Sequence, residues 1–488
     1  MTNAPGSRGD EATAADAGAI ELQRHGYTQE LKRSLSFRDL LTYGLVFMVP
    51  IAPFGIFGSV YAGSGGMVAL AYIIGAIGMA FTAVSYAEMA KAFPMAGSVY
   101  TYAGRGLTQP VGFIAGWLIL LDYILVPALL YIVSGVAMAS LIPAVPVWAW
   151  VVGFIVLNTV VNYFGIEMTA RITKYMLIGE LIVLAIFLVI GVWALANGAG
   201  QGFSFDPIFN PDTFSVGLIF GAVSIAVLSF LGFDAISTLA EENREGAHKI
   251  GRSMVAALAL AGTLFVVQTW VAALLVPDPQ ALLSGSGNLG TAFYDAAGVA
   301  GGPFLATLTA VATAVAWGFA DALVAQAATS RVLYAMARDR QLPSFLRTIH
   351  PKHRVPTNAT VLIAAVSVAI GVYMASRADG IALLSTMVNF GALSAFILLH
   401  VAVIGHYVVK HGSRSPRHLV VPVCGLLILG YVLWSANIAA QVTGLSWLAI
   451  GIVVAIALRL AGRTLALAGA SESGGSEEPE TGGSRRQD

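Results

Sequence analysis

The chain has 488 residues, of which 57% are hydrophobic and 11% are charged, and its mean hydropathy is +0.79. Soluble domains carry roughly 25% charged residues, so this composition excludes a soluble globular enzyme and indicates that lipid surrounds most of the protein. The formal net charge is 0 and the single cysteine is Cys424, so neither a nucleic-acid partner nor an internal disulfide is expected.

The two ends of the chain differ in composition from the middle. Residues 1–36 are rich in small and acidic residues without apolar periodicity, and residues 468–488 form a polar low-complexity tail. We expect both ends to be disordered and cytoplasmic. The first apolar run begins near Leu40 and is too long for a cleavable signal peptide. We therefore expect a membrane domain over residues 37–467 whose first helix directs insertion.

Twelve apolar runs of roughly 20 or more residues follow one another along this domain. They cover residues 40–62, 67–92, 111–141, 146–165, 172–196, 214–240, 251–276, 303–330, 356–376, 381–405, 419–440 and 444–466. If the N-terminus is inside, every Lys and Arg except Arg377 falls in a cytoplasmic segment or at a cytoplasmic helix end. The sequence therefore predicts twelve transmembrane helices in the bacterial plasma membrane, with both termini cytoplasmic.

Two of the twelve runs contain residues that break helices at mid-membrane depth. The first has Pro50 and Pro53 with flanking glycines, and the sixth has Gly232 between Phe230 and Phe233. Interrupted helices at corresponding positions of two halves indicate the central binding site of a transporter. The alternative is that these residues only kink their helices, as Pro and Gly often do in membranes.

Four acidic residues lie inside apolar runs, and no Lys or Arg lies at comparable depth. They are Asp122, Glu180, Asp234 and Asp321. At about 1.5 Å per helical residue, all four can lie in one layer. A charge at the bilayer centre costs at least about 2.5–3.5 kcal/mol, so these acids require cations, protons or water. The expected cargo is a cation, a proton or both, unless some acids are permanently protonated or hydrogen-bonded to the backbone.

Five segments of the chain resemble the signature stretches of the amino acid-polyamine-organocation (APC) superfamily. They are Phe81–Met89, Phe93–Tyr102, Ser229–Ala235, Leu239–Glu242 and Arg331–Asp339. The resemblance covers essentially the whole membrane region, and within the superfamily Leu120–Tyr123 and the first run look most like bacterial putrescine importers. It implies an all-α LeuT-like fold, in which residues 40–196 and 214–405 form a five-plus-five inverted repeat and residues 419–466 add two helices. It also implies alternating access and secondary transport, commonly coupled to protons.

The resemblance also assigns roles to individual positions. The two broken segments match substrate-contacting regions of the family, which here include Val49, Pro50, Ile51, Ala52, Pro53, Phe230, Gly232, Phe233 and Asp234. Glu180 falls by register where some proton-coupled permeases have a lysine, so it can carry the coupling proton or hold a cationic substrate. Asp321 also differs from the family pattern, because a small or hydroxyl residue is expected at this position in a putrescine importer.

The chemistry of the first break favours an amine substrate. Pro50 and Pro53 have no N–H with which to bind a carboxylate. We expect a proton-coupled importer of putrescine or a similar amine, with Asp234 and Asp122 as ammonium partners. Its aromatic walls are expected to be Tyr123, Phe230 and Phe233. Glu180 or Asp321 is expected to carry the proton.

Other functions remain open at this point. An amino acid permease or exchanger is possible because the N–H groups of Ile51, Ala52 and Phe54 could hold a carboxylate. An ion channel would need a continuous pore, which two broken helices around an occluding site argue against. The sequence contains no catalytic motif of the serine-hydrolase, zinc-protease or P-loop kind, and it indicates no metal site and no cofactor.

A cytoplasmic gate is expected where the sixth and eighth helices end. Glu241 and Glu242 can pair there with Arg331, and Arg338 and Asp339 can belong to the same gate. A solvated helix end is the alternative, since basic residues are required there by topology. His400, the one histidine deep in a run, is expected to be packed and hydrogen-bonded rather than part of a proton relay. The oligomeric state stays open.

Overall fold

The computed structural model describes residues 31, 33–95, 98–142, 144–164, 166–284, 289–338, 342–377, 380–436 and 438–460. Within these ranges the chain is helical, with two isolated bridges and no strand. Nine of the described helices are long and apolar enough to cross a membrane, and the bent pair α2 (Phe37–Met48) and α3 (Pro53–Gly63) makes a tenth. Two shorter apolar helices, α7 (Val147–Tyr163) and α16 (Val420–Ser435), coincide with the remaining predicted runs.

The other elements follow in chain order. They are α4 (Val68–Ala92), α5 (Ser98–Gly106), α6 (Gln109–Leu141), α8 (Ile166–Ala196), α9 (Val216–Ala226), η1 (Val227–Phe230), η2 (Phe233–Glu242), α10 (Ala247–Leu274), α11 (Pro279–Leu283), α12 (Ala292–Val315), η3 (Ala316–Asp321), α13 (Ala322–Arg338), η4 (Ser344–Arg347), α14 (Thr357–Ala375), α15 (Gly380–Val403), η5 (Ile404–Lys410) and α17 (Ile438–Leu460). The short α5 was not expected, and α17 begins before the predicted residue 444.

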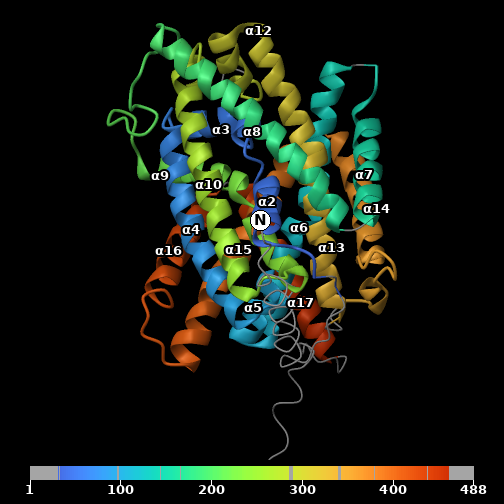
Figure 1. Cartoon of the computed structure of the whole chain (residues 1–488). Helices are drawn as coiled ribbons and strands as arrows, with labels where there is room; N and C mark the ends of the chain where they lie inside the picture. The colour runs from blue at the N-terminus through green and yellow to red at the C-terminus, as the bar shows by residue number, and fades with distance from the viewer. Residues whose placement is uncertain are drawn as a thin grey trace, which may run out of the picture.

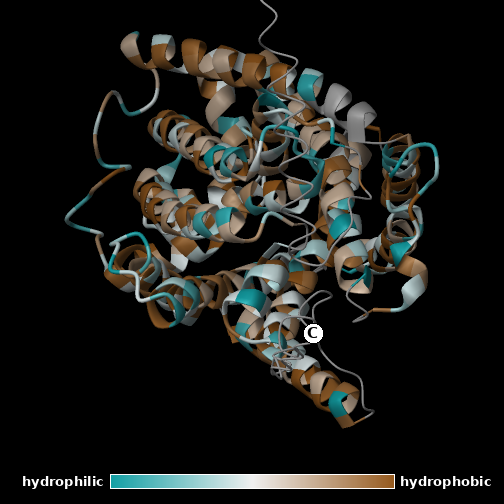
Figure 2. Cartoon of the chain, turned by 60° about the horizontal axis from the view of Figure 1, so that its bottom comes forward, coloured by the Kyte–Doolittle hydropathy of each residue, from teal (hydrophilic) through white to brown (hydrophobic). Residues whose placement is uncertain are grey.

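The surface of the bundle has the character of a membrane protein. Large apolar side chains are exposed on several helices, including Val189, Trp434 and Val453. Figure 2 shows that hydrophobic residues predominate along the helices. Such a surface is stable in lipid and would aggregate in water. The chain is thus a multi-pass membrane protein.

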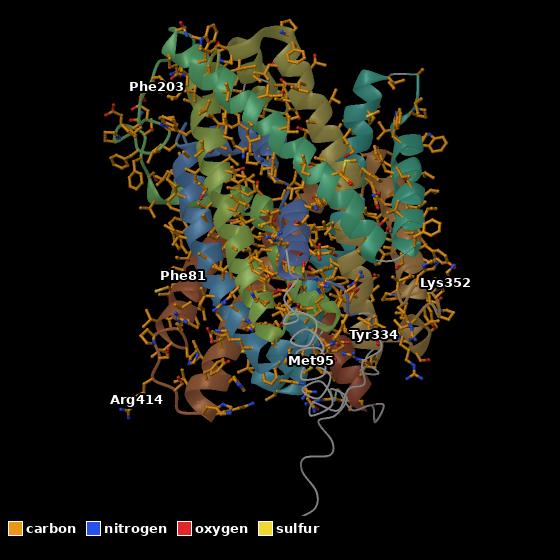
Figure 3. The ribbon with its side chains drawn as sticks, viewed as in Figure 1. Phe81, Met95, Phe203, Tyr334, Lys352 and Arg414 are labelled. Carbon is orange, nitrogen blue, oxygen red and sulfur yellow. The ribbon has the colours of Figure 1, made fainter. Side chains whose placement is uncertain are left out.

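Two basic residues lie in the same half of the bundle. Figure 3 shows Lys352 and Arg414 in its lower half, together with Tyr334 of α13, while Phe203 lies near the upper end. The predicted topology assigns both basic residues to the cytoplasmic side. The sidedness of the two ends in the cell stays a prediction.

The segment before α2 is ordered where the structure describes it, which differs from the disorder expected over residues 1–36. Ser36 caps α2, and its hydroxyl and backbone N–H exchange hydrogen bonds with Asp39 in a capping box. The N–H groups of Ser34 and Leu35 both donate to the Glu242 carbonyl at 3.0 Å. These contacts offset the entropy cost of ordering the segment. Residues 1–30 and the predicted tail 468–488 lie outside the described residues.

The two interrupted elements meet in the middle of the bundle. Helix α2 packs against α10, α8 and η2, and Figure 1 shows it at the centre of the molecule. Helices α6 and α13 and the π-helical turn η3 pack around the same region. This arrangement brings the broken segments and several buried acids together.

Candidate functional site

The first break lies between α2 and α3, which are bent by 53° relative to each other. Helix α2 ends at Met48, and the next residue, Val49, has φ of +46°, which is unusual for a β-branched residue and is found mainly where the surroundings impose it. Helix α3 begins with Pro53, whose missing N–H is not needed at the first helical position. The Pro50 carbonyl accepts a hydrogen bond of 2.9 Å from Gln268 Nε2 of α10.

The second break lies at Leu231 and Gly232, between η1 and η2. Gly232 has φ of +114°, a region that favours glycine. A Cβ at this position would lie 2.7 Å from the Phe47 ring and 2.9 Å from the Phe47 carbonyl oxygen. Glycine is therefore required both by the backbone conformation and by the close approach of the first break.

A small cavity with a volume of about 40 Å³ lies where the two breaks meet. Its lining consists of Phe47, Met48, Val49, Ala52, Ile56, Asp122, Tyr123, Val126, Leu129, Leu130, Leu228, Ser229, Leu231, Gly232, Asp234, Trp317 and Asp321. This lining, as far as the chain is described, contains three carboxylates and no Lys, Arg or His. Three of the four predicted acids are thus together in one apolar cavity.

Asp234 is held by donors from two elements. The Tyr123 hydroxyl of α6 donates to Asp234 Oδ2 at 2.7 Å, and the Gly232 N–H donates to Oδ1 at 3.3 Å. The backbone carbonyl of Tyr123 accepts in turn from the Thr329 hydroxyl of α13. Hydrogen bonds to a carboxylate are stronger than those between neutral groups, so the position of Asp234 is well defined.

Asp321 and Trp317 reach the cavity from the π-helical turn η3. The widened turn shifts the helical register locally, and both side chains face the cavity. In the described chain, Asp321 Oδ1 and Trp317 Nε1 are buried and make no hydrogen bond. A buried donor and a buried acceptor without partners are costly unless a ligand or water pairs with them. Trp317 was not predicted, and its spacing of four residues from Asp321 is the only sequence signal for it.

Glu180 lies outside the cavity. It is buried, and neither carboxylate oxygen makes a hydrogen bond within the described chain. It lines a separate apolar groove between α8 and α12. Asp321 lies close enough to interact electrostatically with both Glu180 and Asp122, as Asp122 does with Asp234. Asp321 is thus the cavity residue that links the electrostatics of the cavity to Glu180.

Phe230 and Phe233 are not among the lining residues, so they do not form the expected aromatic walls. Phe230 packs against Phe265 with ring centroids 5.1 Å apart, and Phe233 packs against Tyr86 at 5.8 Å. The positive φ at Gly232 turns Leu231 and Asp234 toward the cavity and leaves the two phenylalanines facing the surrounding helices. The aromatic walls are formed by Phe47, Tyr123 and Trp317 instead.

Three residues of the first break are also absent from the lining. Pro50, Ile51 and Pro53 are buried in the packing behind Val49 and Ala52. The N–H groups of Ala52 and Phe54 donate to the carbonyls of Val49 and Ile51 at 2.7 and 2.9 Å. Of the three N–H groups that could hold a carboxylate, only that of Ile51 makes no hydrogen bond within the described residues.

The predicted gate residues form two ion pairs, one buried and one partly buried, which we call the ion-pair layer. Arg331 pairs with Glu242 through Nε and Oε1 and through Nη2 and Oε2. Arg338 pairs with Glu241, with Nη1 and Oε1 2.9 Å apart. Both glutamates belong to η2 and both arginines to α13, so the ion-pair layer joins the second broken span to the helix behind it. Asp339 lies outside the described residues.

A group of phenylalanines lies toward the opposite end, and we call it the aromatic cluster. It consists of Phe54 and Phe57 of α3, Phe187 of α8 and Phe293 of α12. The Phe293 ring stacks on Phe54 with centroids 3.9 Å apart and contacts Phe187 at 4.7 Å. Figure 1 shows α3, α8 and α12 in the upper half of the molecule. The cavity thus lies between the ion-pair layer and the aromatic cluster.

His400 is buried and hydrogen-bonded, in agreement with the packed alternative. Its Nδ1 lies 2.9 Å from the Ser85 hydroxyl and its Nε2 lies 3.2 Å from the Thr82 hydroxyl. Both partners belong to α4, so the imidazole joins α4 to α15. Cys424 is partly buried and free.

Comparisons with known proteins match most of the chain to membrane permeases and transporters. A family model described as amino acid permease matches residues 40–458. The chain is 29% identical to the low-affinity putrescine importer of Escherichia coli (strain K12), over 87% of this chain and 93% of that protein. It is 26% identical to a branched-chain amino acid permease of Bacillus subtilis (strain 168), over 87% and 93%. It is also 25% identical to a methylthioribose transporter of the same strain, over 89% and 95%.

Proposed function

Because the chain belongs to the amino acid permease family, whose members are transporters and not enzymes, we propose that it imports a cationic amine across the plasma membrane, with putrescine as the leading candidate. In this proposal the protein is a secondary transporter that works by alternating access and is coupled to protons. The similarity to a putrescine importer supports it.

One observation carries the proposal. The described cavity lining contains Asp122, Asp234 and Asp321 but no cationic side chain. Carboxylates in an apolar, membrane-buried site require positive charge nearby. A diamine brings two ammonium groups, which can pair with Asp234 and Asp122, while Asp321 adds a third negative charge to the lining. The rings of Phe47, Tyr123 and Trp317 add attraction of about 0.5–2 kcal/mol for an ammonium group.

The first break supports an amine over an amino acid. A zwitterion needs N–H donors for its carboxylate, and the N–H groups of Ala52 and Phe54 are already bonded to backbone carbonyls. The Ile51 N–H remains, and the relatives include an amino acid permease. An amino acid permease or exchanger is therefore the second candidate, and direct competition between a diamine and the matching monocarboxylate separates the two.

We extend the proposal to the whole membrane domain. Residues 40–196 and 214–405 form two inverted five-helix repeats, and residues 419–466 supply two further helices, giving twelve spans with cytoplasmic termini. The ion-pair layer faces the cytoplasm and the aromatic cluster faces outward. Opening one while the other stays closed exposes the cavity to one side at a time.

The proposed substrate role of Asp234 is tested by uptake of radiolabelled putrescine into proteoliposomes. We expect uptake to rise with an inward proton gradient and to fall at least about tenfold in Asp234→Asn, since a charged hydrogen-bond partner is lost. Asp295→Asn is the matched control, because Asp295 is exposed near the start of α12. Uptake of neutral amino acids with no response to putrescine would refute the amine assignment.

The proposed proton route is tested separately with Glu180→Gln. Glu180 is not among the residues that line the cavity but interacts electrostatically with Asp321. We expect this variant to exchange putrescine across the membrane at equal pH while losing gradient-driven accumulation. Loss of both activities would place Glu180 in the substrate site, and retention of both would remove it from the coupling mechanism.

A further inference from the structure

Helices α4 and α10 enclose a long groove on the outer surface of the bundle. They lie side by side (Figure 1) and run antiparallel, since Lys91 near the end of α4 lies with His248 near the start of α10. Two hollows between them share Val255 and Ala259, so they are continuous. The groove follows one face of each helix, because its residues recur every three or four positions along both.

The floor of the groove is made of small residues. A Cβ on Gly251 would lie 2.6 Å from the Ala87 Cβ, and a Cβ on Gly262 would lie 3.3 Å from the Ala76 Cβ. The two backbones therefore approach closely, and the side chains beside them are too small to fill the space above. The upper part of the groove is lined almost wholly by apolar side chains, such as Ile77 and Val267, which are exposed.

Charge occurs at one end of the groove. Lys91, Arg252, Arg417 and His248 converge there with a single acid, Glu88. Glu88 is already paired with Lys91 at 2.8 Å and lies 3.6 Å from His418 Nε2. Arg252 and Arg417 are exposed and make no ion pair within the described ranges. This end therefore has uncompensated positive charge.

The length of the groove is comparable to the thickness of a membrane. From Lys91 to Ile73 the groove extends about 27 Å along α4, at about 1.5 Å per residue. A hydrocarbon core is about 30 Å thick, so the part of the groove from Lys91 to Ala80, about 16 Å long, spans one leaflet. The charged end then lies at headgroup depth when the apolar part lies among the acyl chains. The orientation of the helices in the membrane explains why basic residues occur at this end. It does not explain why Arg252 and Arg417 both line a groove of this length.

We propose that this groove binds one anionic diacyl phospholipid. Arg252 and Arg417 hold the headgroup phosphate, and an acyl chain lies over the small residues between α4 and α10. Basic pockets between membrane helices on the cytoplasmic side are suited to anionic headgroups. The site is separate from the cavity and does not depend on which substrate is carried.

The test is native mass spectrometry of the full-length protein titrated with dioleoyl phosphatidylglycerol or, at the same concentrations, dioleoyl phosphatidylcholine. We expect one phosphatidylglycerol to bind preferentially, and the double variant R252Q/R417Q to bind it about thirtyfold more weakly, equivalent to about 2 kcal/mol for two basic residues. Arg414→Gln is the matched control, because Arg414 is exposed and does not line the groove (Figure 3). It should leave binding within about twofold.

A second variant tests the apolar part with every charge intact. Ala259 is exposed and shared by both hollows, so Ala259→Trp fills the groove without disturbing the core and should weaken phosphatidylglycerol binding severalfold. Equal binding of the two lipids, undiminished binding by R252Q/R417Q, undiminished binding by Ala259→Trp, or displacement of the lipid by glycerol phosphate alone would each overturn the proposal. An unchanged thermal midpoint in lipid-free detergent verifies that each variant is folded.

Discussion

The ion-pair layer and the aromatic cluster flank the same cavity but are built from different chemistry. At one end, Arg331 and Arg338 of α13 pair with Glu242 and Glu241 of η2. At the other end, Phe293 is packed among the rings of Phe54, Phe57 and Phe187. Both groups join a broken span to neighbouring helices. Each is therefore a contact that alternating access would have to release.

The two kinds of contact respond differently when a residue is replaced or the salt concentration is changed. A buried ion pair is stable only while both partners are present, because the loss of one leaves an uncompensated charge. When an aromatic contact is removed, the loss of stability grows with the apolar area that is exposed and includes the favourable energy of each ring pair. Salt does not weaken such a contact. The two ends should therefore respond differently to substitution and to ionic strength.

The largest effect is expected from Arg331→Gln. The change leaves Glu242 buried without its partner, which should lower the free energy of unfolding by about 3–5 kcal/mol. The double variant E242Q/R331Q should recover much of this loss, because no buried charge remains. Thermal unfolding of the purified protein measures both. If the double variant were as unstable as the sum of its single variants, the two residues would not act as a pair.

The same variant should also open one end of the cavity. In a C424S background, a cysteine at Ser229 lines the cavity and reports access. We expect Arg331→Gln to accelerate labelling by a membrane-impermeant thiol reagent added on the side of the ion-pair layer. Faster labelling only from the opposite side would contradict the assignment of this layer as a closure.

A smaller effect is expected from Phe293→Leu. The substitution keeps most of the apolar volume but removes ring contacts with Phe54 and Phe187, each worth about 0.5–1.5 kcal/mol. The free energy of unfolding should fall by about 1–3 kcal/mol, equally at low and high salt. Phe304→Leu is the control, since Phe304 is 68% exposed and its replacement should change little. A salt-dependent loss in Phe293→Leu would mean that charge also contributes at this end.

The smallest effect is expected from Lys91→Gln. Lys91 pairs with Glu88, but its side chain is 43% exposed, so solvent screens the interaction. Pairs of this kind contribute about 0–1 kcal/mol, and raising the salt concentration should remove the difference from the unchanged protein. A loss comparable to that in Arg331→Gln would show that burial does not distinguish the two kinds of pair.

The bundle was largely predictable from sequence because hydropathy and helix breakers act locally. The depth of Asp122, Asp234 and Asp321 follows from counting residues along helices, and these three acids do share a cavity. Counting gives depth but not direction. Glu180 has the expected depth but lies against a different groove, because the face it presents depends on how α8 packs against α12.

Two further differences arise from backbone conformation. The positive φ of Gly232 decides that Asp234 faces the cavity while Phe230 and Phe233 do not, and a glycine in a sequence does not reveal its φ. The π-helical turn η3 changes the register at Trp317, so a regular helical count does not place its ring. Both features lie where helices are irregular, which is where tertiary packing overrides local preference.

The backbone contacts of the segment before α2 have a practical consequence. Ser34 and Leu35 donate to the Glu242 carbonyl, and the Arg244 N–H donates to the Leu35 carbonyl, so this strip of chain is attached to the end of η2 that bears the ion-pair layer. Any displacement of that end must carry the strip along or detach it. A fluorophore attached near Ser34 would therefore act as an optical reporter of each turnover, without any probe inside the permeation pathway.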